Sequence, residues 1–99
     1  MGWTRVLVVV KPFKLDAVVR ALLECGAVSL TVSEARGYGR QKGHLDAYRD
    51  SDRQVSFLPK VRLECAIPKD RLEEAIQRVE TAAKTGRIGD GKIFVGELE

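Results

Sequence analysis

The hydrophobic pattern of this chain switches repeatedly between the period of a strand and that of a helix, and the order of these switches limits the fold. The segment from Trp3 to Val10 is rich in β-branched residues, which is typical of a buried strand. From Leu15 the apolar residues follow the spacing of an amphipathic helix, and Gly26 lies where such a helix commonly stops. Val28 to Ala35 alternates as a second strand. The predicted faces of that strand are Val28, Leu30 and Val32 on one side, and Ser29, Thr31 and Ser33 on the other.

The second half of the chain repeats this order. Val61 to Ile67 alternates as a third strand, and Lys92 to Leu98 has the pattern of a short last strand. Between them, Pro68-Lys69-Asp70 opens a helix, with Asp70 as its cap and Glu73 completing a capping box. The buried stripe of this helix is predicted to be Leu72, Ala75, Ile76, Val79, Ala82 and Ala83.

The predicted elements follow one another as strand, helix, strand, long loop, strand, helix and strand. This is the order of the ferredoxin-like βαββαβ sandwich. We therefore expect residues 1–99 to form a single α+β domain, with both helices on one face of an antiparallel sheet. The first strand is apolar on both faces, because Leu7 and Val9 alternate with the valines at 6, 8 and 10. A chain of 99 residues cannot cover both faces of its sheet, so oligomerisation is expected.

Composition and charge exclude several classes of function. Hydrophobic residues make up 44% and charged residues 31% of the chain, as in an ordinary soluble globular protein. The formal net charge of +3 is too small, and the strand aromatics are too few, to indicate nucleic-acid binding. The longest apolar run, Val6 to Val10, is far shorter than the roughly 20 residues of a membrane span, so a cytoplasmic location is expected. Cys25 and Cys65 are expected to be core thiols.

Two segments around the long loop carry residues suited to an anionic ligand. Gly37 to Ser56 lacks any periodic pattern, and a loop of this length is usually functional or disordered. It opens with Gly37-Tyr38-Gly39-Arg40-Gln41-Lys42-Gly43-His44, whose third glycine falls one place too late for a dinucleotide fingerprint. These glycines can bring backbone amides close to a phosphate, or serve only as a loop hinge. In the loop exit, Phe57 to Glu64, Lys60 and Arg62 are either ligand contacts or solvated strand charges.

A third segment, Thr85 to Ile93, contains Gly86-x-x-x-x-Gly91-Lys92 and comes close to a P-loop. Ile93 stands where the P-loop requires a Mg²⁺-binding Ser or Thr, and the segment follows a helix instead of a strand. A P-loop NTPase is therefore not expected. The alternatives are a phosphate cradle that uses Arg87 and Lys92, or a turn that needs glycine at positive φ.

Four segments in order together resemble the PII signal-transduction family, and the resemblance spans nearly the whole chain. Lys11 to Leu15, Gly37 to His44, Phe57 to Val61 and Thr85 to Val95 resemble its N-terminal stretch, loop entry, loop exit and second nucleotide-binding signature. The resemblance implies a compact homotrimer of ferredoxin-like subunits, with ADP, AMP or ATP in the clefts between them. It also implies that residues 39–57 form the flexible T-loop, which reports the bound ligand to a target.

Carried over position by position, the resemblance implies a nucleotide site built from several parts of the chain. The loop base would wrap the nucleotide, Lys60 and Glu64 would lie near its phosphates and base, and the second signature would cradle it. Leu30 and Thr31 would come from the neighbouring subunit. A second effector, such as 2-oxoglutarate beside Mg-ATP, would use Gln41, Lys60 and Lys11. The implied nucleotide-binding residues are Leu30, Thr31, Gly37, Tyr38, Gly39, Arg40, Gln41, Lys60, Glu64, Thr85, Gly86, Arg87, Gly89, Asp90, Gly91 and Lys92.

Two departures from the family pattern modify these expectations. Arg53 stands where uridylylated members have their modified tyrosine, which argues against uridylylation, whereas Ser51 matches a serine phosphorylated in some cyanobacterial members. The sequence ends at Glu99, before the segment in which typical members carry two phosphate-binding arginines. Losing two charge-assisted contacts, each worth roughly 1.5–3 kcal/mol, is expected to weaken triphosphate binding most, so that ADP or AMP competes well with ATP.

The sequence therefore favours a nucleotide-sensing protein that regulates a target, such as a transporter or an enzyme, through its loop. The two departures also resemble the carboxysome-associated branch, so an inorganic-carbon sensor that binds bicarbonate is the main alternative. A nitrogen sensor that binds 2-oxoglutarate and a nucleotide-hydrolysing enzyme are the remaining alternatives. The only histidine, His44, lies in the loop, and the sequence positions no Cys–His, Ser–His or paired-carboxylate arrangement. No catalytic residue and no metal ligand is assigned.

Overall fold

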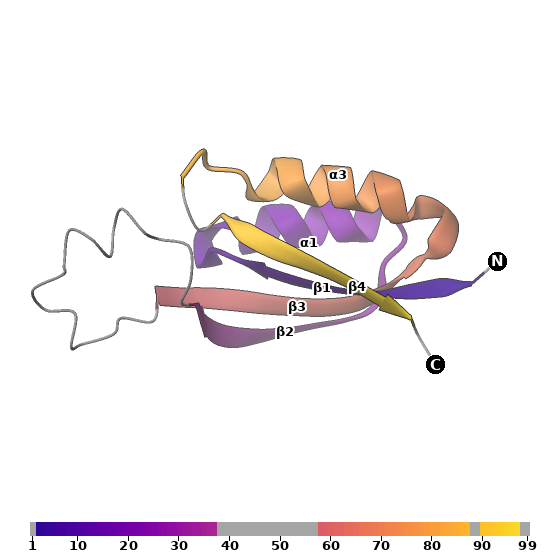
Figure 1. Cartoon of the computed structure of the whole chain (residues 1–99), viewed down its shortest axis with the longest axis horizontal. Helices are drawn as coiled ribbons and strands as arrows, with labels where there is room; N and C mark the ends of the chain where they lie inside the picture. Colours follow the sequence, from indigo (N-terminus) through magenta and orange to yellow (C-terminus); the bar gives the residue numbers. More distant parts are fainter. Residues whose placement is uncertain (1, 38–57, 88–89, 98–99) are drawn as a thin grey trace, which may run out of the picture.

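The computed structural model describes residues 2–37, 58–87 and 90–97, and it shows two helices packed on one face of a four-stranded sheet (Figure 1). The strands are β1 (Trp3–Val10), β2 (Val28–Gly37), β3 (Leu58–Pro68) and β4 (Gly91–Glu97). The helices α1 (Leu15–Glu24) and α3 (Leu72–Ala83) follow the 3₁₀ turns η1 (Pro12–Lys14) and η3 (Lys69–Arg71). The described ladders are antiparallel, in the order β2-β3-β1-β4. The predicted ferredoxin-like α+β fold is confirmed.

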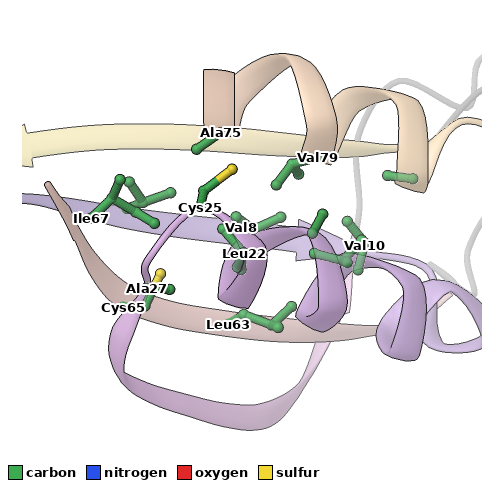
Figure 2. Close-up of a cluster of buried hydrophobic side chains, with 14 of the residues drawn as sticks. Val8, Val10, Leu22, Cys25, Ala27, Leu63, Cys65, Ile67, Ala75 and Val79 are labelled. Carbon is green, nitrogen blue, oxygen red and sulfur yellow. The ribbon is translucent and has the colours of Figure 1, made fainter. Parts of the chain in front are cut away.

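The core lies between the helices and one face of the sheet (Figure 2). In the central strand β1, every second residue faces the helices, and Val6, Val8 and Val10 are at most 2% exposed. Full burial of a side chain of this size stabilises the fold by roughly 1.5–3 kcal/mol. The residues that complete this layer include Val61, Leu63 and Ile67 from β3, Val18 and Leu22 from α1, and Ala75 and Val79 from α3.

Both cysteines belong to this core, as predicted. Cys25 and Cys65 are free thiols with exposed fractions of 0% and 4%. Burial raises the pKa of the Cys65 thiol to about 11, and burial is also the largest cause that raises the pKa of Cys25. At neutral pH both thiols are therefore protonated and pack as small apolar groups.

The start of the second helix differs from the prediction. Asp70 lies inside η3, and α3 begins only at Leu72, with Arg71 at its N-cap position. No side-chain hydrogen bond caps α3, so the predicted capping box with Glu73 is absent. The 3₁₀ turn places Asp70 before the first α-helical turn, too early in the chain to accept from the N–H groups of that turn.

The face assignment of the second strand is also corrected. Ser29 has a φ of 55°, and the register between β2 and β3 shifts between Val28 and Thr31. Val28 is opposite Ala66 and Thr31 is opposite Glu64, so Val28 shares a face with Thr31 and not with Leu30 or Val32. A β-bulge inserts one extra residue in a strand and reverses the alternation beyond it.

No described helix packs on the second face of the sheet. Leu7 and Val9 are partly exposed there, beside the side chains of Arg5, Arg62 and Glu64. Arg5 Nε donates to Glu64 Oε2 at 2.6 Å, and Arg62 Nη2 donates to Glu64 Oε1 at 3.3 Å. Partly apolar residues on an uncovered face fit the predicted oligomerisation, which stays a prediction.

Gly91 stands where the chain enters β4 against the backbone of β1. Its φ is 152°, and a Cβ there would lie 2.6 Å from Val9 O and 3.1 Å from Val10 Cγ1. We predict that Gly91→Ala lowers the free energy of unfolding by about 1–3 kcal/mol, because β1 and β4 must separate locally to admit the methyl group.

The matched control is Gly96→Ala in the same strand, where a Cβ would meet nothing within 4 Å. Urea midpoints at equal protein concentration measure both effects. Equal midpoints for the two variants would show that the close approach at Gly91 is not a constraint.

Candidate functional site

One end of the sheet collects the residues that the sequence singled out. The ladders of β1 both end at Val10, which is opposite Val61 on β3 and opposite Gly91 on β4. One step further, Lys11 leaves β1 between Lys60, which precedes Val61, and Asp90, which precedes Gly91. The end of β2 and the starts of β3, β4 and α1 lie at this same end of the molecule, on the left in Figure 1.

The turn between α3 and β4 is held by a single carboxylate. Asp90 Oδ2 accepts from the backbone N–H groups of Thr85 at 2.8 Å and Gly86 at 3.1 Å. The Thr85 hydroxyl donates to Asp90 Oδ1 and accepts from the backbone N–H of Arg87 at 3.2 Å. The hydrogen bonds from Thr85, with smaller contributions from Lys11 and Gly86, hold the pKa of Asp90 far below its usual range. Asp90 is therefore an anion at any physiological pH, and its role here is to close the turn.

Lys11 connects this turn to the end of β1. Its Nζ donates to Thr85 Oγ1 and to Asp90 Oδ1, both at 3.2 Å. The side chains of Lys11 and Asp90 are only 17% and 26% exposed, so water screens this pair less than an ion pair on the open surface. The contact fixes the turn against the sheet.

Lys60 and Lys92 add two further ammonium groups. Lys60, at the start of β3, is only 7% exposed, whereas Lys92 is exposed and lies opposite Val9 in the β1–β4 ladder. Burial is the main cause that lowers the pKa of Lys60; the charges of Lys11 and Lys92 lower it further, and Asp90 opposes them. Among the described side chains at this end of the sheet, the ammonium groups of Lys11, Lys60 and Lys92 lie near the carboxylate of Asp90, which favours an anionic ligand.

The helix-facing side of this end of the sheet is mainly apolar. A cavity of about 320 Å³ lies between α3, β1 and β4 and includes Asp90, Gly91 and Lys92 in its lining. Most of the other lining residues are apolar, among them Val8, Val10, Ile76, Val79, Ile93 and Val95. A phosphate or carboxylate is therefore better accommodated on the open face, where the ammonium groups are.

The structure thus brings together much of the predicted site. The residues at this end of the sheet are Lys11, Gly37, Lys60, Thr85, Gly86, Arg87, Asp90, Gly91 and Lys92. The backbone N–H groups of Thr85, Gly86 and Arg87 donate within the turn, so among the described residues the side-chain cations are the main candidates to donate to a ligand.

Glu64, Thr31 and Leu30 lie elsewhere. Thr31 is opposite Glu64 in the β2–β3 ladder, and Glu64 lies four positions along β3 from Lys60, which corresponds to about 13 Å. Leu30 packs partly against the core. Arg5 was not predicted as part of this region, because it contacts Glu64 from a position 59 residues away in the chain. The antiparallel pairing of β1 with β3 brings Arg5 close to Glu64, and the contact becomes evident only from this pairing.

Six predicted site residues, Tyr38, Gly39, Arg40, Gln41, Ser51 and Gly89, lie outside the described residues, as does the whole of the T-loop segment 39–57. The described ranges contain no cluster of three metal-ligating side chains and no helix long and apolar enough to cross a membrane. The Thr85 hydroxyl contacts Asp90, but a carboxylate whose pKa is this low is a weak general base. The arrangement is suited to binding an anion.

Comparison with known proteins agrees with this geometry. The family model for nitrogen regulatory protein P-II matches residues 3–99. Nitrogen regulatory protein GlnK of Escherichia coli K12 is 54% identical over 94 residues, which cover 95% of this chain and 84% of that protein. Nitrogen regulatory protein P-II of Mesorhizobium japonicum is 54% identical over 91 residues, covering 92% and 81%.

The fold comparison gives the same answer. The crystal structure of Arabidopsis thaliana PII bound to citrate matches 98% of this chain and 78% of that one, with a TM-score of 0.73 and 34% identity. Sequence and fold therefore agree over nearly the whole length, and the chain belongs to the PII family of nitrogen regulatory signalling proteins.

Proposed function

We propose that this PII-family protein senses adenine nucleotides, with the phosphates held among Lys11, Lys60 and Lys92. The observation that carries the proposal is the convergence of these three ammonium groups on a turn that Asp90 closes. Multiple cations around a small volume favour a ligand with several negative charges. Occupancy of the site changes the conformations available to residues 39–57, and this loop regulates the target protein, a transporter or an enzyme.

The remaining predicted residues complete the proposed site. Gly37 allows the ligand to approach the backbone closely, Gly91 leads from the turn into β4, and Arg87 supplies a further cation from the turn. The loop base, with Tyr38, Gly39, Arg40 and Gln41, wraps the nucleotide, and Gly89 extends the cradle. Ser51 remains the candidate for phosphorylation.

The assembly we propose is a homotrimer of single-domain chains whose nucleotide sites lie between subunits. Its support is the uncovered sheet face, where Leu7 and Val9 are partly exposed. Thr31 and Glu64 stand side by side on that face, too far along the strands to contact a phosphate at Lys60. In a trimer, a neighbouring subunit supplies Leu30 and Thr31 to the ligand, and Glu64 lies near its base.

ADP or AMP is proposed to compete well with ATP. The supporting observation is that Asp90 already neutralises Lys11, which leaves less positive charge for a third phosphate. Mg²⁺ would accompany ATP, because the phosphates of the nucleotide are its ligands. The proposed activity is binding, and no hydrolysis is assigned.

The second effector is proposed to be 2-oxoglutarate in preference to bicarbonate, which reverses the order favoured by the sequence. The relatives at 54% identity are named nitrogen regulatory proteins, and the Arabidopsis relative is described as bound to citrate, a polycarboxylate. Lys11, Lys60 and Gln41 are the residues proposed for the carboxylates. In calorimetry on the Mg-ATP-loaded protein, we expect binding of 2-oxoglutarate and none of bicarbonate; the opposite pattern would restore the inorganic-carbon alternative.

We predict that Lys92→Gln weakens ATP binding roughly tenfold or more, because it removes one charge-assisted contact to a phosphate. The control is Lys69→Gln, which alters an exposed lysine in η3, away from the proposed site. Isothermal titration with ATP, ADP and AMP measures both variants against the parent protein. An equal loss in the two variants, or ATP at least tenfold tighter than ADP in the parent, would contradict the proposed site or its ligand preference respectively.

Asp90→Asn is predicted to destabilise the protein in a pH-dependent way. The pKa of Asp90 is depressed in the folded state, so its contribution is complete above an unfolded pKa of about 3.9 and decreases as the pH falls further. The urea midpoint of the variant should therefore be lower than that of the parent at pH 7, and the difference should shrink below about pH 4.

Asp70→Asn is the control for this experiment, because Asp70 is exposed and caps neither η3 nor α3. It should leave the urea midpoint at pH 7 nearly unchanged. A destabilisation by Asp90→Asn that is the same at pH 3 and pH 7 would show that the ionised carboxylate does not hold the turn.

A further inference from the structure

The turn between α3 and β4 gathers four hydrogen-bond donors around the carboxylate of Asp90. The backbone N–H groups of Thr85 and Gly86 donate to Oδ2, and the Thr85 hydroxyl and Lys11 Nζ donate to Oδ1. Backbone N–H groups, a hydroxyl and an ammonium group are also the donors that hold phosphate oxygens in proteins. The chain therefore places a negative charge of its own where a phosphate would find suitable donors.

Lys11 brings this carboxylate close to any anion that it binds. Its Nζ uses two of its three N–H donors on Thr85 Oγ1 and Asp90 Oδ1, both at 3.2 Å, which leaves one donor for a ligand. A phosphate oxygen that accepts from this donor lies within about 6 Å of Asp90 Oδ1, because a charge-assisted hydrogen bond is about 2.8 Å long. One ammonium group then contacts two anions that repel each other.

We propose that Asp90 is a specificity-determining residue, whose fixed negative charge disfavours a nucleotide more strongly the more negative its phosphates are. This inference rests on the proposed function, in which Lys11 takes part in holding the phosphates. Charges about 6 Å apart lie within the Debye length of about 8 Å at physiological ionic strength, and the side chains of Lys11 and Asp90 are partly buried, so the repulsion is not fully screened. ATP therefore gains less over ADP than its additional phosphate would otherwise provide.

The hydrogen bonds of the turn keep this charge in place. They hold the pKa of Asp90 far below its usual range, so the carboxylate remains ionised when a phosphate approaches at physiological pH. Rotation of the side chain away from the ligand would remove the acceptor of the Thr85 and Gly86 N–H groups, and lost hydrogen bonds of this kind are costly. The repulsion is therefore a constant property of the site.

The test is isothermal titration of ATP and of ADP in magnesium-free buffer, with the parent protein and with Asp90→Asn, which removes the charge and nearly keeps the shape of the side chain. We expect the ratio of the ADP Kd to the ATP Kd to rise at least fivefold in Asp90→Asn. The rise should be smaller with Mg²⁺ present, because the metal offsets part of the phosphate charge. Asp90→Ser is a second neutral variant that gives the same measurement if Asp90→Asn does not fold, and circular dichroism monitors folding.

Two further variants separate the charge of Asp90 from the shape of the turn. Asp90→Glu keeps the charge, and Thr85→Val removes the hydroxyl that contacts Lys11, Asp90 and the Arg87 N–H but keeps the charges of Lys11 and Asp90. Thr85→Val should weaken ATP and ADP by similar factors, so in both variants the Kd ratio should stay within about twofold of the parent ratio. Asp70→Asn makes the same change in net charge at an exposed position in η3 and should leave both Kd values unchanged.

An unchanged Kd ratio in a folded neutral variant at position 90 would overturn the proposal. A rise in Asp90→Glu or Thr85→Val as large as that in Asp90→Asn would also overturn it, because the cause would then be the shape of the turn. These results would leave the proposed function intact as long as the parent protein binds nucleotides. A parent protein that binds neither ATP nor ADP would instead contradict the proposed function, and this inference with it.

Discussion

The pairing of β1 with a strand on each side determines where every residue of the candidate site lies. Val6, Val8 and Val10 are buried under the helices, and a slip of one residue would turn all three toward the opposite face. The hydrophobic core therefore specifies the register of both ladders. Because both ladders end at Val10, Lys11 emerges between Lys60 and Asp90 as a consequence of core packing. The same register that buries the valines also brings the polar residues of the site together.

The uncovered sheet face connects this site to the proposed assembly. The ion pairs of Glu64 with Arg5 and Arg62 contribute little in an exposed setting, where they are screened by water and salt. If a neighbouring subunit covers this face, Glu64 is already paired with Arg5 and Arg62 before assembly. This pairing reduces the free-energy cost of removing the three charges from water. This account explains how a sheet face can combine partly exposed apolar residues such as Leu7 with an ordered charge network.

The sequence predicted the elements with strong periodicity well and their ends less well. The bounds of β1 match the prediction, because a short run of β-branched residues that ends at Lys11-Pro12 favours a strand. β3 starts at Leu58, three residues before the predicted Val61, because ladder hydrogen bonds continue where the side-chain pattern has stopped. The bulge at Ser29 requires a positive φ, and a serine in the sequence does not predict this backbone conformation. The wrong predictions concern backbone conformation, which a pattern of hydrophobic side chains does not predict.

The same distinction applies to the candidate site. The resemblance to the PII family implied that Lys60, Thr85 and Lys92 belong to one nucleotide site, and the structure places these residues at one end of the sheet. The role of Asp90 could not be predicted, since it depends on hydrogen bonds inside the turn and on Lys11, 79 residues away. The described residues thus place part of the proposed site at one end of the sheet.

The most direct test of the central claim is a crystal structure of the protein grown with ATP. The account predicts phosphate oxygens within hydrogen-bond distance of Lys11, Lys60 and Lys92 of one subunit, and the nucleoside next to Thr31 of another. A nucleotide bound elsewhere, or a monomer whose sheet face remains uncovered, would contradict it.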